Sequence, residues 1–274
     1  LLSGSGSYRT LLWRVAWHDF TAHPAVGSGA GSFEARWYRY RSYTLDASHA
    51  HELYLETLAE LGPLGLALLL VSLGAPLVAA WRARRHPLAA GATAAYVAFL
   101  AHVAADRDWQ VAAVGLVAIA SAATLLVLAR ETPSAPAGTA GRTCAALAGG
   151  VLALFALWGL WGAYPLGQAR DAAAAQDWTR VESEAARAVR RRPGSSSLAW
   201  QLLGEAQSAR GAPAAARASL RVAVARDPDS WAAWRDLADV SSGDARRAAA
   251  RHALVLNPRD PGVQSLARTL GLVD

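Results

Sequence analysis

The stretch LGLALLLVSLGAPLVAAW, residues 64–81, carries no charged side chain and ends directly before Arg82. A helix rises about 1.5 Å per residue, so this stretch is long enough to cross a hydrocarbon core of about 30 Å. Three further apolar stretches of similar length follow, at about 88–105, 109–129 and 144–164. Four such segments with short connections favour membrane-spanning helices over the buried core of a water-soluble protein. The sequence therefore predicts an all-α, polytopic transmembrane bundle.

Arginines in the connecting loops predict the sidedness of this bundle. The loop at 82–87 holds three arginines and the loop at 130–143 holds two. Both loops are expected in the cytoplasm, because positive residues in short loops favour that side. The loop at 106–108, the first 62 residues and the tail at 168–274 then fall outside. We therefore expect three parts: an extracytoplasmic region at 1–62, four spans within 63–164, and a soluble helical tail.

Composition argues against several other classes of protein. The 274 residues are 53% hydrophobic but include 27 basic and 21 acidic side chains, which suits a chain divided between lipid and water. No basic face is interleaved with aromatic residues, so nucleic acid is not expected as a partner. The single Cys144 provides no disulfide or zinc framework. The missing initial Met indicates the C-terminal part of a longer protein.

Residues 1–62 mix Trp, Tyr and Arg in a way that is typical of the membrane–water interface. Apolar residues at helical spacing predict a helix from Arg9 to Phe20. A His-Pro pair at 23–24 should end that helix, because proline disfavours helix in the residue before it. The Gly-Ser-Gly-Ala-Gly run at 27–31 predicts a flexible turn.

A second helix is expected from His51, leading directly into the first span after a break at Gly62-Pro63. His51 would then lie at the outer mouth of the bundle. A histidine can act there as a general base because its pKa lies near neutrality. An isolated surface histidine more often has no catalytic role. His49 lies two residues before His51, on a different face if the segment is helical, and is a weaker candidate.

The motifs of this region, taken in order, resemble those of the O-antigen ligase and polymerase family. That family has a G-R-x3-W helix, an H-P-x2-G-x-G-x-G-x-F turn and an H-N-x-Y-L-x3-A-E-x-G helix that enters the membrane. The corresponding motifs here begin at Arg9, His23 and His51. Two departures stand out: Ser7-Tyr8 replaces the residues usual before the arginine, and Glu52 replaces the usual Asn or Ser.

A further segment extends the resemblance over residues 9–110. The sequence His-Val-Ala-Ala-Asp-Arg-Asp-Trp at 102–109 is similar to an H-x3-D-x-D-W step of related bacterial members. Family members carry more spans upstream than this chain has, together with a further pyrophosphate-binding arginine.

The resemblance implies an enzyme that transfers a glycan on the outer face of the bacterial plasma membrane. The donor would be a glycan on undecaprenyl pyrophosphate, and the acceptor a hydroxyl of another glycan, a lipid or a protein. His51 would activate that hydroxyl, and Arg9 would stabilise the departing pyrophosphate, since a guanidinium binds phosphate oxygens bidentately. No metal or other cofactor is expected if arginines supply the positive charge.

Four other residues are candidate substrate-binding groups. Arg36 and Arg39 could line a path for phosphate, although an arginine beside aromatic residues is more often an interfacial anchor. Asp106 and Asp108 fall on the same outer side as His51 in the expected topology. They could bind the acceptor or orient the histidine.

The tail at 168–274 is rich in Ala and Arg, with prolines at 193, 228 and 258. Its central unit contains Trp200, Leu203, Gly204, Gly211, Ala216, Leu220, Ala223 and Pro228. This pattern resembles the tetratricopeptide repeat, in which small residues let two antiparallel helices pack closely. We expect a short solenoid with a possible protein partner, and the alternative is an alanine-rich helical bundle.

Three functions remain open from the sequence. The resemblance favours a membrane glycosyltransferase. A second possibility is a non-catalytic, membrane-anchored scaffold whose repeats recruit proteins for cell-envelope assembly. The third is a transporter or another polytopic protein whose motifs match by accident. The spans hold almost no charge beyond His102, which argues against ion transport.

Overall fold

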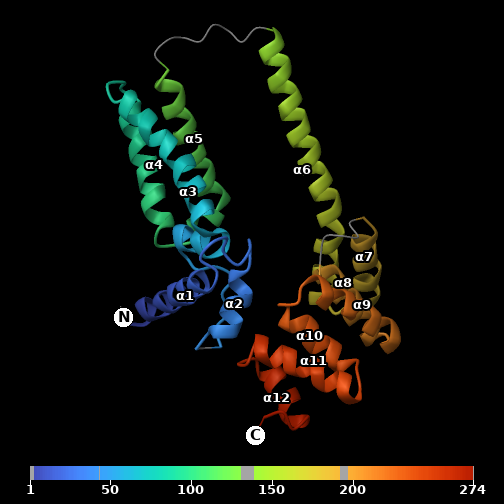
Figure 1. Cartoon of the computed structure of the whole chain (residues 1–274). Coiled ribbons are helices and arrows are strands. Elements are labelled where there is room, and N and C mark those ends of the chain that lie inside the picture. The colour runs from blue at the N-terminus through green and yellow to red at the C-terminus, as the bar shows by residue number, and fades with distance from the viewer. Residues whose placement is uncertain (1–2, 43, 131–138, 192–196, 274) are drawn as a thin grey trace. The chain divides into compact units, whose positions relative to one another are not determined.

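The structure is a computed structural model that describes residues 3–42, 44–130, 139–191 and 197–273. Within these residues every regular element is helical, and no β-strand occurs (Figure 1). The all-α prediction is therefore confirmed. The chain divides into two compact units, Leu1–Ala135 and Pro136–Asp274.

The described residues of the first unit form five α-helices and one short 3-10 turn. They are α1 (Ser3–Ala22), α2 (Phe33–Tyr40), α3 (Leu53–Arg82), α4 (Ala89–Val103), η1 (Asp108–Gln110) and α5 (Ala112–Leu128). α3, α4 and α5 pack against one another, while α1 and α2 pack near the beginning of α3. Leu12, Phe33 and Trp37 are fully buried where these last three helices meet.

The second unit begins with a long helix and continues in shorter ones. They are α6 (Thr139–Ala174), α7 (Trp178–Arg191), α8 (Ser197–Ala209), α9 (Pro213–Arg226), α10 (Trp231–Asp239), α11 (Gly243–Leu256) and α12 (Pro261–Thr269). Each of these helices packs against the next along the chain. The closing part of α6 joins this core, because Ala169 and Ala172 are buried together with Val181 of α7 and Leu202 of α8.

In the part of the chain that the structure describes, two helices are long and apolar enough to cross a membrane: Leu53–Arg82, and Gly149–Ala174 within α6. The predicted spans at 88–105 and 109–129 coincide with α4 and α5, which are shorter apolar helices of 15 and 17 residues. The loop predicted at 130–143 falls largely outside the described residues, and so does Pro193 of the tail pattern.

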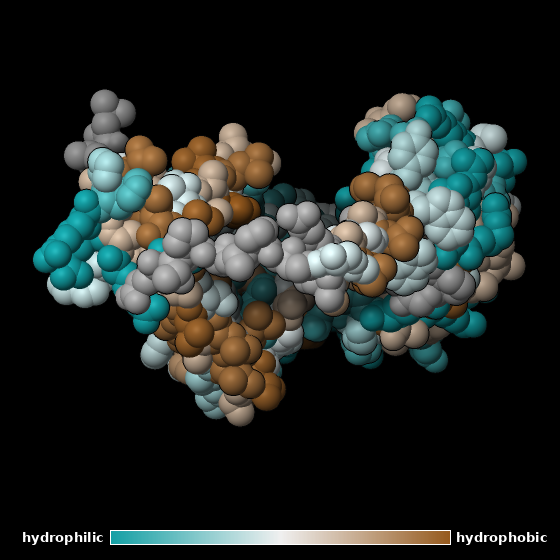
Figure 2. All heavy atoms as spheres, turned by 90° about the horizontal axis from the view of Figure 1, so that it is seen from above, coloured by the Kyte–Doolittle hydropathy of each residue, from teal (hydrophilic) through white to brown (hydrophobic). Residues whose placement is uncertain are grey.

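Large apolar side chains lie on the surface of these helices. Figure 2 shows hydrophobic atoms gathered over the first unit, whereas hydrophilic atoms cover most of the visible face of the second unit. The exposed residues include Leu64, Leu68, Val71, Val78, Leu116, Ile119, Val127, Leu154, Phe155 and Trp158. Apolar surface on this scale marks an interaction with lipid or with other helices rather than with water.

α3 begins later than predicted but bends at the predicted position. The predicted helix start at His51 is wrong: His51 has a φ of +58°, and α3 begins at Leu53. The predicted break at Gly62 is a kink inside α3, where Gly62 has φ +68° and ψ −173°. Residues that carry a side chain rarely adopt this backbone angle, so glycine suits the kink.

Candidate functional site

Arg9, His51 and Asp106 come together although they lie far apart in the sequence. The Arg9 Nη2 donates a hydrogen bond to the Asp106 Oδ2 at 2.8 Å, and the His51 Nδ1 lies 3.5 Å from the Asp106 Oδ1. Arg9 belongs to α1, His51 precedes α3, and Asp106 lies in the loop between α4 and α5. A single carboxylate therefore connects the two residues for which the resemblance implies catalytic roles.

Glu52 holds His51 at the entrance of α3. The Glu52 side chain caps the helix by accepting hydrogen bonds from the backbone N–H groups of Tyr54, at 3.2 Å, and of Leu55. Asn and Ser are common helix caps, and Glu52 performs the same task here with a longer side chain. The departure from the family pattern at this position thus preserves the start of the helix, which explains why His51 lies before the helix rather than in it.

The surroundings of His51 orient its imidazole ring. A carboxylate beside Nδ1 favours the tautomer with its proton on that nitrogen, which leaves Nε2 as the proton acceptor. The ring also meets Tyr8 edge-on, with centroids 6.4 Å apart, and Tyr8 in turn meets the buried Trp37. Only 19% of the His51 side chain is exposed. Tyr8 is one of the residues that depart from the family pattern.

The pKa values of His51 and Asp106 are both lowered, for different reasons. Burial is the main cause that lowers the pKa of His51, followed by the positive charges of Arg107 and Arg9, while Asp106 acts in the opposite direction. The pKa of Asp106 is lowered mainly because its carboxylate accepts the Arg107 backbone N–H, at 2.8 Å, and further by Arg9. A neutral histidine beside an ionised carboxylate is the form in which a general base acts at neutral pH.

His49 has a different set of contacts from those of His51. Its Nδ1 lies 2.7 Å from the Oε1 of Glu56, a buried residue of α3. The other carboxylate oxygen of Glu56 accepts the Ala50 backbone N–H at 2.7 Å. His49 and Glu56 therefore fix the backbone that leads into His51.

The glycine-rich run at 27–31, predicted to be a flexible turn, is anchored on α3. The Glu60 side chain accepts hydrogen bonds from the backbone N–H groups of Gly31 at 2.8 Å and Phe33 at 3.1 Å. Gly27 has a φ of +71°, and a Cβ there would lie 2.3 Å from the carbonyl carbon of Glu60. This close approach attaches the connection between α1 and α2 to α3. It therefore holds α1, which carries Arg9, beside His51 at the start of α3.

Asp108 does not join Asp106 at His51. The Asp108 Oδ2 lies 2.7 Å from the Nδ1 of His102, near the end of α4. Both residues also line a cavity of about 420 Å³ between α4 and α5. The two aspartates of the loop thus pair with different histidines.

Arg36 and Arg39 have partners on α1 and α2. The Arg36 Nε lies 3.2 Å from the Oδ1 of Asp19, a buried residue of α1. The Arg39 guanidinium lies over the ring of Tyr40, 5.6 Å from its centroid. Their role in binding phosphate stays a prediction.

Two further residues of the site, Arg107 and Asp19, carry local sequence signals that do not by themselves predict their contacts. Arg107 stands between two aspartates, and its backbone and charge act on Asp106 and His51. Asp19 lies one helical turn before His23, and its Oδ1 is 3.3 Å from the Nδ1 of that histidine. Their longer-range partners, Arg36 for Asp19 and His51 for Arg107, come close only in the folded chain.

Positive charge at this site comes from arginines. Arg9 contacts Asp106 directly, and Arg107 is exposed beside it. Among the described residues, His, Cys, Asp and Glu side chains form no group of three or more that could hold a metal ion.

Residues 1–70 match the O-antigen ligase family. The matched segment covers 70 of the 274 residues and includes Arg9 and His51, whereas Asp106 lies beyond it. None of the curated proteins compared with the chain matches it. The match supports the family resemblance and indicates a glycosyltransferase activity like that of an O-antigen ligase. O-antigen ligases are integral membrane proteins, which the two long apolar helices fit.

Proposed function

We propose that this protein is a membrane glycosyltransferase that moves a glycan from undecaprenyl pyrophosphate to an acceptor hydroxyl on the outer face of the bacterial plasma membrane. The observation that carries the proposal is the carboxylate of Asp106, which contacts both His51 and Arg9. A base and a group that stabilises phosphate must lie near each other in such a reaction, because the attacked carbon lies between the hydroxyl and the leaving group.

In the proposed reaction, His51 Nε2 takes the proton of the acceptor hydroxyl. The oxygen forms a bond to the anomeric carbon of the donor, and the bond from that carbon to the phosphate oxygen breaks. Undecaprenyl pyrophosphate leaves with the electron pair. Asp106 stabilises the imidazolium that forms and keeps the ring in its productive tautomer.

Arg9 stabilises the charge that develops on the departing pyrophosphate. Asp106 contacts its Nη2, and the guanidinium has further N–H donors. The Arg9 side chain is 41% exposed, so a phosphate can reach those donors. The exposed Arg107 adds positive charge at the same place, and this mechanism requires no metal ion.

Other parts of the substrates have weaker support. Arg36 and Arg39 are proposed contacts for the donor phosphates, and Asp108 is a proposed contact for the acceptor. The acceptor is a hydroxyl of a glycan, a lipid or a protein.

The proposed sidedness agrees with the direction of the helices in the first unit. Arg82 ends α3 and Arg130 follows α5, and both line the same groove between these helices. His51 and Asp106 lie at the opposite ends of α3 and α5. Basic residues favour the cytoplasmic side, so His51 should face the outside of a multi-pass membrane protein.

The tail is proposed to be a solenoid similar to tetratricopeptide repeats, on the outer side, with a protein partner. Its support is the close packing of α8 against α9, where a Cβ on Gly204 would lie 2.6 Å from the Leu220 Cγ. The rings of Trp234 in α10 and His252 in α11 stack with centroids 4.3 Å apart. Both contacts join neighbouring helices, as repeats of paired helices require.

Exchange of His51 for Ala in the natural protein tests the catalytic proposal. We expect the loss of ligated or polymerised glycan, measured by gel electrophoresis of cell-envelope glycans, with an unchanged amount of protein in the membrane. His86→Ala is the control, since His86 is an exposed histidine in the loop at the other end of α3. Unchanged glycan in the His51→Ala variant would instead favour a non-catalytic scaffold.

A further inference from the structure

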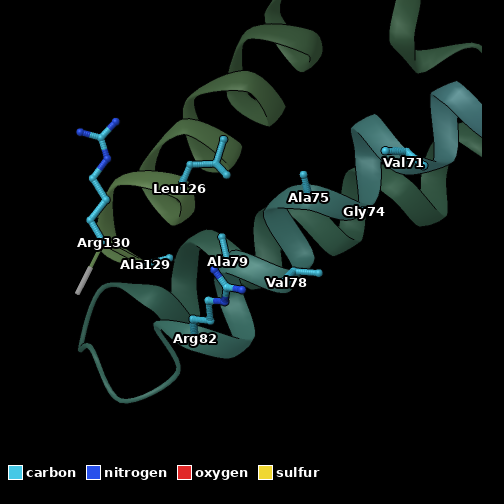
Figure 3. Close-up of a pocket in the computed structure, with 9 residues that line it drawn as sticks. All are labelled: Val71, Gly74, Ala75, Val78, Ala79, Arg82, Leu126, Ala129 and Arg130. Carbon is cyan, nitrogen blue, oxygen red and sulfur yellow. The ribbon is translucent and has the colours of Figure 1, made fainter. Parts of the chain in front are cut away.

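A groove of about 760 Å³ runs between α3 and α5. Aliphatic side chains of Val71, Val78 and Leu126 form its walls, and Gly74 lies between them (Figure 3). A Cβ built on Gly74 meets no atom within 4 Å, so the groove is open at this point. The groove therefore offers an open, largely apolar surface along the helices.

One end of this groove is cationic. Arg82 is the last residue of α3 and Arg130 follows α5, and both side chains are exposed. Figure 3 shows both arginines at the same end, whereas Val71 lies at the other end. The groove thus suits an amphipathic molecule with an anionic head and an apolar tail.

We propose that this groove binds an anionic glycerophospholipid. Its phosphate contacts Arg82 and Arg130, and one acyl chain lies along Val71, Gly74 and Leu126. This inference rests on the membrane insertion that the proposed function requires. Guanidinium groups bind phosphate through charge-assisted hydrogen bonds, and basic pockets between membrane helices are known receptors of anionic head groups.

The charges favour a lipid over a protein helix as the occupant. A helix packed along the groove would need an acidic side chain opposite the arginines, whereas a phospholipid carries its negative charge at the level where the apolar groove ends. Arg84 of the same loop is oriented differently: its Nη1 donates to the Trp81 carbonyl at 2.9 Å, and its guanidinium lies 4.6 Å from the centroid of the Trp81 ring. Among the arginines of the loop at 82–87, Arg82 is the one that lines this groove.

Native mass spectrometry of the purified chain in detergent tests the head-group contact. The probes are dioleoyl phosphatidylglycerol, dioleoyl phosphatidylcholine and, as a soluble phosphate, sn-glycerol 3-phosphate. We expect retention of phosphatidylglycerol, with about tenfold weaker retention in the Arg82→Gln and Arg130→Gln variants. Arg85→Gln is the matched control, because it removes the same charge from the same loop but does not line the groove.

A second pair of variants tests the acyl-chain contact. Gly74→Leu places a side chain in the open groove, and we expect it to reduce phosphatidylglycerol retention. Gly91→Leu is its control, since a Cβ on Gly91 also meets no atom within 4 Å but Gly91 does not line the groove.

Three results would overturn the lipid site. They are equal retention of phosphatidylglycerol and phosphatidylcholine, equal loss in the Arg82→Gln and Arg85→Gln variants, and retention of glycerol phosphate as strong as that of the lipid. Extraction of membranes with alkaline carbonate separates this outcome from a failure of the proposed function. A chain that resists extraction but shows no selective lipid contradicts only the groove, whereas a chain that is released contradicts membrane insertion itself.

Discussion

Asp106 in the first unit and Glu205 in the second are both acidic side chains with charged neighbours, yet their pKa values shift in opposite directions. Asp106 accepts a backbone N–H and lies beside Arg9 and His51, which lowers its pKa. Glu205 of α8 is largely buried and lies near Asp236 of α10, and burial followed by this like charge raises its pKa to about 7. The first carboxylate is charged at neutral pH, whereas the second is close to half-protonated.

The two units use their polar side chains for different purposes. Asp106 lies in a loop beside Arg9 of α1 and Arg107 of the loop itself, and both arginines are at least partly exposed, so their charges can act on a ligand. Glu205 and Asp236 both contact the Gln201 side chain, at 2.9 and 2.8 Å, and so connect α8 to α10. We infer that the first cluster serves chemistry and the second serves packing between helices, which can be tested from either side.

The largest expected effect comes from Arg9. Arg9→Lys keeps the positive charge but loses the planar fork that holds a carboxylate and a phosphate together. We expect glycan transfer to fall by about 10²- to 10³-fold, the usual effect of removing one donor that stabilises developing charge. Transfer is measured as the initial rate with lipid-linked glycan in membranes of cells that carry the variant. Arg14→Lys, on the exposed side of the same helix, should leave the rate unchanged.

Asp106→Asn tests whether the carboxylate positions His51. We expect about a 10- to 100-fold lower rate, which is typical when the partner that orients a functional histidine is lost. The pH profile separates this role from a merely structural one. Asp106 raises the pKa of His51, so its loss lowers that pKa and moves the acidic limb of the profile to lower pH.

Arg107→Gln should shift the acidic limb of the pH–rate profile in the opposite direction to Asp106→Asn. Arg107 lowers the pKa of His51, so its removal should move the acidic limb to higher pH. Shifts in the same direction for both variants would contradict the general-base assignment. A rate loss in Asp106→Asn with no shift at all would indicate a structural role.

Arg9 and His51 could be predicted from the sequence because the motifs that contain them follow one another in the same order as in the family that they resemble. It could not choose between Asp106 and Asp108, since that choice depends on the path of the loop after α4. The short turn η1 carries Asp108 toward His102, and Asp106 is left facing His51. A difference of two residues in one loop decides which carboxylate reaches the site.

Prediction of the fold has the same limit: the sequence indicates the helices but not how segments far apart in the chain meet. Long apolar runs predicted the helices, because apolar side chains must be buried in the protein or contact lipid. The continuity of α6 through Pro165 was not predicted, since proline removes a backbone donor and usually ends a helix. The anchoring of the glycine-rich run at 27–31 was also missed, because Glu60 lies nearly thirty residues away in sequence.

Gly27→Ala tests whether this anchoring holds the site together. The added Cβ would meet the backbone of Glu60 and would also require a φ of +71°. We expect a loss of stability of about 2–3 kcal/mol or more, from strain and the lost close approach. The midpoint temperature of thermal unfolding and the rate of glycan transfer should both fall.

Gly29→Ala is the control for the backbone effect alone, because Gly29 has a φ of +108° but open space around its Cβ position. Equal losses in both variants would mean that the contact with α3 contributes nothing.

Glu205→Gln gives the smallest expected effect and tests the other side of the comparison. A carboxyl group whose pKa is higher in the folded state than its usual value near 4.5 binds a proton more tightly when folded. Its contribution to stability is therefore fully present below about pH 4.5 and is lost as the pH rises through about 7.

We expect the thermal unfolding midpoint of the second unit to fall by a few degrees between pH 5.5 and pH 8 in the unaltered chain. Glu205→Gln should remove most of this fall, because the amide keeps the hydrogen-bonding shape without a charge beside Asp236. The same fall in both proteins would show that Glu205 is charged throughout, and the contrast with Asp106 would then reduce to a difference in exposure.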